Sequence, residues 1–239
     1  ENISLNGPVK IDSVKLGEDG TFDFQENAMD SITPEFYRLR IANQTINLSI
    51  DSTETVTVKA AYPQMSYKYE VEGSENCNTI KELSLKQMLL QSNINAIVKN
   101  PNIGVDSVDV IVARMLNDYK QDIKRNYIFK APMQASSYYA LFQTIQLGNT
   151  NSLIFNPRNN KEDVKVFAAV ATSWDTYYPG AERGKNLHNI AIEGMKDIRI
   201  IENQMAQQKI DASKVQVNGC IELALQDNQG QIRRLSDLK

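Results

Sequence analysis

The sequence contains very few of the side chains that enzymes and metal sites use most often. Its 239 residues include a single histidine, His188, and only two cysteines, Cys77 and Cys220. The cysteines lie far apart and form no C-x-x-C pair, which excludes a self-contained thioredoxin-type dithiol and a four-cysteine zinc site. One histidine without an H-E-x-x-H motif also excludes the common zinc sites. We therefore expect no catalytic residue, no metal and no cofactor.

The sequence also lacks an excess of positive charge and any long apolar run. The 26 lysines and arginines are outnumbered by 29 aspartates and glutamates, whereas nucleic-acid binding requires clustered cations that neutralise phosphates. No apolar stretch approaches the roughly 20 residues that a membrane-spanning helix needs. The first residues, Glu1 to Leu5, show neither an initiator methionine nor a basic or apolar leader. We expect no nucleic-acid partner, and we expect a targeting segment to be missing.

The first 73 residues alternate apolar and polar side chains with the period of a β-strand. Turn sequences separate these stretches, including Gly-Glu-Asp-Gly at 17–20 and Asn43-Gln44. The stretches that we expect to be strands are 9–16, 21–24, 36–41, 45–50 and 54–60. The pattern predicts an antiparallel, sandwich-like β-module over residues 1–73.

From residue 74 the apolar side chains recur every three or four residues, as in helices that pack on other helices. The expected helices cover approximately 74–100, 108–123, 135–147, 161–178 and 185–208. Residues 74–212 are thus predicted to form an all-helical domain. Strand character returns at Ile221 to Leu225, followed by a polar turn at Asn228 and Gly230. The fold class is α+β, with residues 213–239 as a linker and a lone strand.

The most conspicuous candidate binding residues gather around the only tryptophan. They are Tyr138, Tyr139, Trp174, Tyr177, Tyr178 and Arg183. Aromatic side chains with polar tips line ligand grooves and partner interfaces. They also fill seams between helices, where each hydroxyl finds a buried acceptor. Packing in a seam is the commoner case, and a binding surface is the alternative.

The remaining polar candidates each have an ordinary structural interpretation beside a functional one. Cys77 lies near the start of the first predicted helix, where the dipole lowers the pKa of an outward-facing thiol. A Cys77–Cys220 disulfide would close a loop of about 140 residues, but two buried, unpaired thiols are commoner. A Ser-His-Asp or Cys-His site would have to use His188, which we expect to be an ordinary helix side chain. Arg38 and Arg40 share one strand face and could meet a carboxylate or phosphate, although a solvated face is commoner.

The final stretch, IELALQDNQGQIRRLSDLK, resembles the lead-in to a thioredoxin-like domain of the TlpA/ResA or AhpC/TSA-related type. The matching residues are Leu225, Asp227, Gly230, Leu235, Ser236, Leu238 and Lys239. The resemblance implies that residues 213–239 lead into a thioredoxin-like domain and that a W-C-x-x-C redox pair follows Lys239. The pair itself is absent from this sequence, so the resemblance assigns no catalytic residue to any position.

Upstream stretches resemble the N-terminal β-module and helical insert of cell-envelope thioredoxin-like lipoproteins. These stretches are 12–24, 36–60, 69–83, 136–145 and 166–189. The resemblance implies a non-catalytic accessory region of an envelope thiol–disulfide oxidoreductase, lipid-anchored in the periplasm or outer membrane. Its expected partners are the missing thioredoxin-like domain and client proteins with cysteines, and it would meet the membrane only through a missing lipid anchor. The alternative is a ligand-binding envelope lipoprotein without redox activity.

Overall fold

The computed structural model describes residues 1–24, 32–214, 224–226 and 229–234, and the side chains of the last helix as far as residue 208. The chain forms two compact units, Glu1–Ile198 and Arg199–Lys239. It is a mixed α and β protein with small antiparallel sheets. The expected change from strands to helices near residue 73 falls inside the first unit, whose interior we describe below.

The N-terminal region of the first unit contains two small antiparallel sheets. The strands are β1 (Asn2–Ser4), β2 (Gly7–Val9), β3 (Glu35–Ile41), β4 (Gln44–Ile50), β5 (Thr57–Ala60) and β6 (Tyr69–Glu72). The first four form one sheet in the order β2-β1-β3-β4, and β5 pairs with β6. A two-residue turn joins β3 to β4, and Ala42 in that turn adopts a positive φ of 51°, as tight hairpins require. The central hairpin β3–β4 is thus the part of the module that the alternation predicts best.

The strands expected at 9–16 and 21–24 are wrong beyond Val9, because residues 10–24 contain no regular strand. The glycine-rich turn does form, with the Gly20 main-chain N–H donating to the Gly17 oxygen at 2.9 Å. None of the described strands pairs with its arms, and β1 occupies the edge of β3 through the Asn2–Tyr37 pair. The alternating apolar side chains of this stretch, such as Ile11 and Phe22, are therefore left exposed.

The two sheets share one small apolar cluster. Ile46 and Leu48 of β4 pack with Tyr69 and Val71 of β6, and Cys77 lies in the same cluster. Successive side chains of a strand point to opposite faces, so the other face of the β3–β4 hairpin is free to meet the helices. That face contributes Phe36 to the larger helical core. The hairpin therefore belongs to both cores of the first unit.

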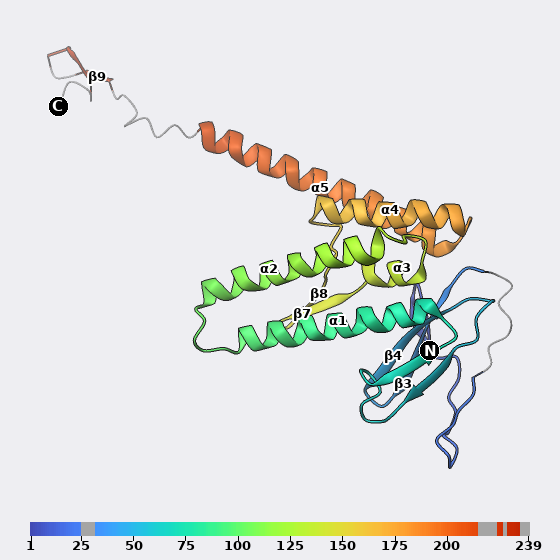
Figure 1. The fold of residues 1–239 in the computed structure, drawn as a ribbon. Coiled ribbons are helices and arrows are strands. Elements are labelled where there is room, and N and C mark those ends of the chain that lie inside the picture. The colour runs from blue at the N-terminus through green and yellow to red at the C-terminus, as the bar shows by residue number, and fades with distance from the viewer. Residues whose placement is uncertain (25–31, 215–223, 227–228, 235–239) are drawn as a thin grey trace. The chain divides into compact units, whose positions relative to one another are not determined.

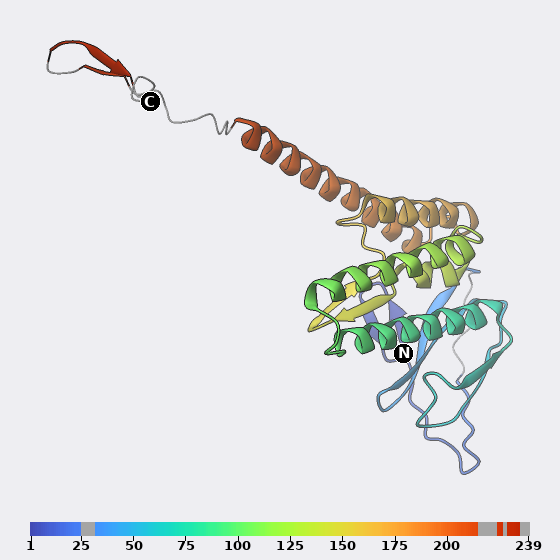
Figure 2. The same cartoon turned by 60° about the vertical axis from the view of Figure 1, so that its left-hand side comes forward.

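The helices lie close to their predicted positions. They are α1 (Glu75–Val98), α2 (Val105–Ile123), the short π-helix η1 (Lys124–Ile128), α3 (Ala135–Leu141), α4 (Lys161–Tyr177) and α5 (Glu182–Lys214). Side chains cap two of them, because Ser74 accepts from the Cys77 N–H at 3.1 Å and Asn160 accepts from the Glu162 N–H at 3.0 Å. Both views show α1 and α2 side by side (Figures 1 and 2).

The prediction of an all-helical domain over 74–212 is wrong at residues 144–153. The third helix ends at Leu141, and a hairpin of β7 (Thr144–Leu147) and β8 (Thr150–Leu153) follows. Gly148, which the sequence suggests as a helix terminator, instead forms the hairpin turn with a φ of 58°. The hairpin lies against α1 and supplies one wall of the site described below (Figure 1).

The second unit contains a short hairpin in the region where the sequence predicts strand and turn. β9 (Ala224–Gln226) pairs with β10 (Ile232–Arg234), and Gly230 in the connection has a φ of 75°. The rest of the predicted strand, residues 221–223, lies outside the described residues. No helix in the described part of the chain has an apolar stretch long enough to cross a bilayer.

Candidate functional site: a neutral cleft beside the first helix

Two of the six candidate binding residues, Tyr138 and Trp174, meet in the interior of the first unit. Their ring centroids lie 4.9 Å apart, and Tyr138 also packs at 5.0 Å against Phe36 of β3. Trp174 is fully buried and Tyr138 nearly so. Burial raises the pKa of the Tyr138 hydroxyl, and the guanidinium of Arg183 opposes part of that rise. These residues pack in a seam between the sheet and the helices, as expected for the commoner of the two interpretations, and they do not form a binding surface.

Arg183 fastens this seam from the start of α5. Its guanidinium donates to the main-chain oxygen of Ile3 at 2.7 Å and to the Glu35 carboxylate at 2.8 Å. The same group lies over the rings of Phe36 and Tyr138, a geometry that the planar guanidinium favours. Arg183 is only 7% exposed, so it is occupied by the fold and is not available to a ligand.

The other three candidates separate from one another. Tyr177 is exposed on α4, and Tyr178 is half-buried with its ring edge-on to Trp174. Tyr139 points away from the seam, because neighbouring positions on a helix face different directions. Its hydroxyl instead contacts Ser84 of α1 and Asn47 of β4. Of the six candidates, Tyr139 alone lines the cleft described below.

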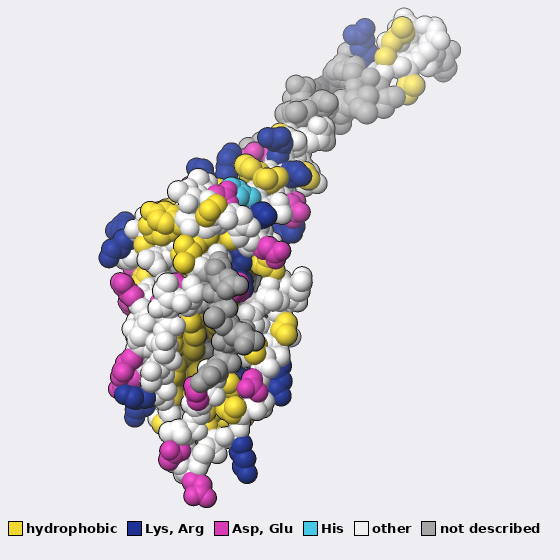
Figure 3. All heavy atoms as spheres, turned by 90° about the vertical axis from the view of Figure 1, so that its right-hand side faces the viewer, with side chains coloured by type: hydrophobic (Ala, Val, Ile, Leu, Met, Phe, Trp, Pro, Cys, Tyr) yellow, Lys and Arg dark blue, Asp and Glu magenta, His cyan; other side chains and the backbone are white. Residues whose placement is uncertain are grey.

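His188 lies on the surface, where it pairs with a carboxylate. Its Nε2 is 2.5 Å from Asp175 Oδ2, and Asp175 is its only hydrogen-bond partner among the residues that the structure describes. Figure 3 shows the histidine in cyan on the molecular surface. A histidine and a carboxylate without a nucleophile do not form a catalytic triad, so His188 fits the ordinary interpretation.

Cys77 does not face outward, because its side chain is fully buried, so the commoner expectation of a buried thiol is the one that holds for this residue. The thiol of Cys77 donates to the main-chain oxygen of Ser49 at 3.1 Å, and its Sγ atom accepts from the main-chain N–H of Ser49 at 3.4 Å. Burial raises the pKa of this thiol. Cys77 is a free, buried cysteine, and Cys220 lies outside the described residues. The two arginines on β3 are also occupied, with Arg38 donating to Asn47 and Arg40 pairing with Glu1.

An open cleft of about 560 Å³ lies between β4, α1, α3 and the β7–β8 hairpin. Amide, hydroxyl and apolar side chains line it, and none of them is charged. The lining residues are Thr45, Ile46, Asn47, Ser66, Tyr69, Ser84, Gln87, Met88, Gln91, Tyr139, Thr144, Gln146 and Asn151. Because they come from segments spread over about a hundred residues, no local motif in the sequence points to this site.

Two glutamines of α1 shape one wall by holding the edge of β7. The side-chain amide of Gln91 forms two hydrogen bonds with the main chain of Gln146. It donates to the main-chain oxygen at 2.9 Å and accepts from the main-chain N–H at 2.8 Å. Gln87 donates to the Thr144 oxygen at 2.6 Å. The side-chain amides thus replace the neighbouring strand that β7 lacks on this side, which satisfies main-chain groups that would otherwise need water.

A directed chain of hydrogen bonds joins α1, α3 and β4 beside the cleft. Ser84 donates its hydroxyl proton to the main-chain oxygen of Ile80 at 2.8 Å, so it must accept from the Tyr139 hydroxyl at 2.9 Å. Tyr139 in turn accepts from the Asn47 amide nitrogen at 3.3 Å. Arg38 donates to the other end of that amide, which sets the amide's orientation.

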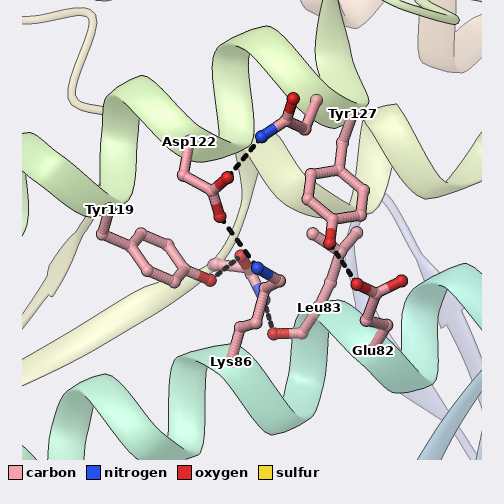
Figure 4. A network of polar contacts seen from close by, with 8 residues as sticks. Glu82, Leu83, Lys86, Tyr119, Asp122 and Tyr127 are labelled. Atoms are coloured by element: carbon pink, nitrogen blue, oxygen red, sulfur yellow. Dashed lines mark hydrogen bonds and ion pairs between the residues drawn. The ribbon is translucent and has the colours of Figure 1, made fainter.

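A second polar network holds α1 and α2 together behind the cleft (Figure 4). Lys86 of α1 pairs with Asp122 of α2 at 2.9 Å, and Tyr127 of η1 donates to Glu82. Burial, followed by this hydrogen bond, raises the pKa of Tyr127 to about 12. The network fixes the helix that supplies Ser84, Gln87, Met88 and Gln91 to the cleft, so the site has a rigid wall.

A further buried contact ties this network to the cleft wall. Tyr119 of α2 donates to Gln143 at 2.7 Å, and Gln143 donates to the Leu83 oxygen at 3.0 Å and to Gln87 at 3.3 Å. The side chain of Gln87 is thereby held from two sides. Hydrogen-bonded supports of this kind keep the groups of a binding site in one orientation.

The cleft presents hydrogen-bonding and apolar side chains. None of the thirteen lining side chains ionises near neutral pH, as general acid–base catalysis requires. The described residues also contain no cluster of histidine, cysteine, aspartate or glutamate that could hold a metal ion. Comparisons with protein-family models, with curated proteins and with solved structures found no match for this chain.

Proposed function

We propose that this chain is a non-catalytic binding region whose cleft holds an uncharged, hydrogen-bonding segment of another molecule. The single observation that carries the proposal is the lining of the cleft, which combines many neutral donors and acceptors with no charge. Binding sites generally place a few polar groups that fix orientation beside apolar contacts, and here Met88 and Ile46 supply the apolar part. Because the lining is neutral, we expect binding to depend little on salt.

The wider role that we propose is the accessory region of an envelope thiol–disulfide oxidoreductase. The resemblance of the final residues to the lead-in of a thioredoxin-like domain supports it, and so does the resemblance of the upstream stretches to envelope lipoproteins. The partners would be that domain, beyond Lys239, and client proteins whose segments occupy the cleft. The apolar cluster shared by the β3–β4 and β5–β6 pairs supports the proposed sandwich-like module over 1–73.

The alternative is a ligand-binding envelope lipoprotein without redox activity, which the cleft supports equally well. The coding sequence downstream of Lys239 separates the two. A W-C-x-x-C motif within a βαβ pattern would favour the oxidoreductase, and a stop codon would favour the lipoprotein.

The binding proposal is tested by a charge placed inside the cleft and a matched charge placed beside it. Met88 lines the cleft and is 42% exposed, whereas the next residue, Leu89, is 62% exposed and lies outside it. We expect Met88→Glu to weaken binding of a permanently unfolded probe, reduced and carboxamidomethylated ribonuclease, at least tenfold in calorimetry. Leu89→Glu should bind like the wild type. Equal binding by both variants, or no binding by the wild type, would refute the proposal.

A further inference from the structure

The outer edge of β4 shows what kind of ligand fits the cleft. In an antiparallel pair, every second residue of a strand points its main-chain N–H and C=O away from the partner strand. On β4 these residues are Thr45, Asn47 and Ser49, since the register places Asn47 opposite Arg38. The Arg38 N–H donates away from β4, to the Glu1 oxygen at 2.8 Å, which agrees with a pair that is not hydrogen-bonded.

Other parts of the chain already occupy this edge on both sides of Asn47. The Thr45 N–H donates to Ser66 Oγ at 2.9 Å, and Cys77 Sγ bonds to both main-chain groups of Ser49. Among the residues that the structure describes, the main-chain N–H and C=O of Asn47 have no hydrogen-bond partner. Asn47 lines the cleft, so the one open position of the edge faces it.

The side chains around this open position are already engaged with one another. The directed chain that ends at the Ile80 oxygen already engages the side chains of Asn47, Tyr139 and Ser84. Tyr69 differs, because its ring is buried in the cleft wall while its hydroxyl has no hydrogen-bond partner within the described ranges. The groups on this side of the cleft that are free to meet a ligand include the main chain of Asn47 and the hydroxyl of Tyr69.

We infer that the ligand of the cleft is an extended polypeptide, one residue of which pairs with Asn47 through two main-chain hydrogen bonds. This inference rests on the proposed binding function and specifies its ligand. Addition of a chain to an exposed sheet edge is a common mode of peptide recognition. Here the addition is limited to a single bridge, because Ser66 and Cys77 already occupy the edge at Thr45 and Ser49. These two positions lie about 13 Å apart along the strand, with Asn47 between them.

The cleft fits a neutral glycan less well. Recognition of a sugar ring uses a flat, accessible apolar surface as well as hydrogen bonds. The ring of Tyr69 is only 5% exposed, and the Lys81 ammonium lies 5.2 Å from its centre. The Tyr69 ring therefore offers a sugar no open aromatic platform, which favours a peptide main chain.

The inference is tested with an acetylated and amidated hexapeptide of alternating threonine and valine, and with six versions of it that each carry one N-methyl group. If one ligand residue donates to the Asn47 oxygen, N-methylation at one position should weaken binding at least tenfold. Methylation at the residue on either side, whose N–H points away from β4, should have little effect. Uniform tolerance of methylation would overturn the inference.

Two substitutions at one position test the donor on the protein. Asn47→Ala removes the side chain and keeps the N–H, whereas Asn47→Pro also removes the N–H, at an edge position where proline is tolerated. We expect the proline variant to bind the hexapeptide at least tenfold more weakly than the alanine variant. Equal affinities of two folded variants would overturn the inference. If the proline variant does not fold, the methylation series alone decides.

The outcomes keep this inference separate from the binding function. Suppose that Met88→Glu abolishes hexapeptide binding but no N-methyl group affects it. The cleft would then remain the binding site, and the inferred main-chain bridge would be overturned. Binding of cellohexaose, a neutral glycan, in place of the hexapeptide would have the same meaning. If neither probe binds and Met88→Glu also leaves binding of the unfolded ribonuclease unchanged, both the inference and the proposed function fail.

Discussion

Substitution of Arg183 by alanine should destabilise the first unit by about 3–4 kcal/mol. The guanidinium makes two hydrogen bonds, to Ile3 and Glu35, and hydrogen bonds to a charged group contribute about 1.5–3 kcal/mol each. Its contacts with the rings of Phe36 and Tyr138 add about 0.5–2 kcal/mol. Glu35 is 32% exposed, so water will hydrate it in part after the substitution. That recovery places the expected loss at the lower end of the sum.

The control is Arg158, which also contacts two carboxylates, Glu193 and Asp197, but is 68% exposed. Exposed pairs contribute about 0–1 kcal/mol, so Arg158→Ala should change the free energy of unfolding by less than about 1 kcal/mol. Urea unfolding can be followed by the emission of Trp174, the only tryptophan, which lies in the same seam as Arg183. If Arg183→Ala costs no more than Arg158→Ala, the seam does not fasten the sheet to the helices.

Three further predictions follow from buried or strained groups. In a Cys220→Ser variant, Cys77 should react with Ellman's reagent only after unfolding, because burial raises its pKa; rapid reaction of the native protein would contradict this. The phenolate absorbance of Tyr127 can be isolated as the difference between the wild type and Tyr127→Phe in a pH titration. This difference should appear near pH 12, not near pH 10. Because that pKa is raised by folding, its stabilising contribution should be complete below about pH 10 and disappear as the pH rises through 12. Gly73→Ala should cost about 3 kcal/mol or more in the same urea assay, because φ is +93° and a Cβ would lie 1.9 Å from a main-chain oxygen. Gly148→Ala, at φ +58° in open space, should cost only about 1–2 kcal/mol, and equal costs would contradict the steric argument.

The helices could be predicted because their signals are local. The apolar stripe of α1 repeats every three or four residues, and Ile80, Leu83, Leu90 and Ile94 are buried as that stripe requires. The β3–β4 hairpin could be predicted equally well, because alternation on both sides of a tight turn fixes its register. In these elements the neighbours along the chain contain the information.

Most errors occur where distant partners decide the structure. The β7–β8 hairpin is different, because its two-residue Gly148-Asn149 turn is a local signal that the helix expected over 135–147 overlooked. Only the contacts of β7 with Gln91, some 55 residues away, depend on the tertiary fold. Residues 10–24 alternate like a strand but pair with none of the described strands. The cleft is missed for the same reason, since Asn47 and Asn151 become neighbours only through the tertiary fold. Tyr139 is the exception, because tyrosine, an aromatic side chain with a polar tip, is a recognisable binding candidate.

The most direct test of the account is a nuclear magnetic resonance titration of the isotope-labelled chain with the carboxamidomethylated ribonuclease. The account predicts that the largest amide shifts occur at Asn47, Gln91 and Asn151, and that Met88→Glu suppresses them. Shifts centred on Tyr177, or no shifts at saturating probe, would contradict the claim that this chain is a binding region that works through its neutral cleft.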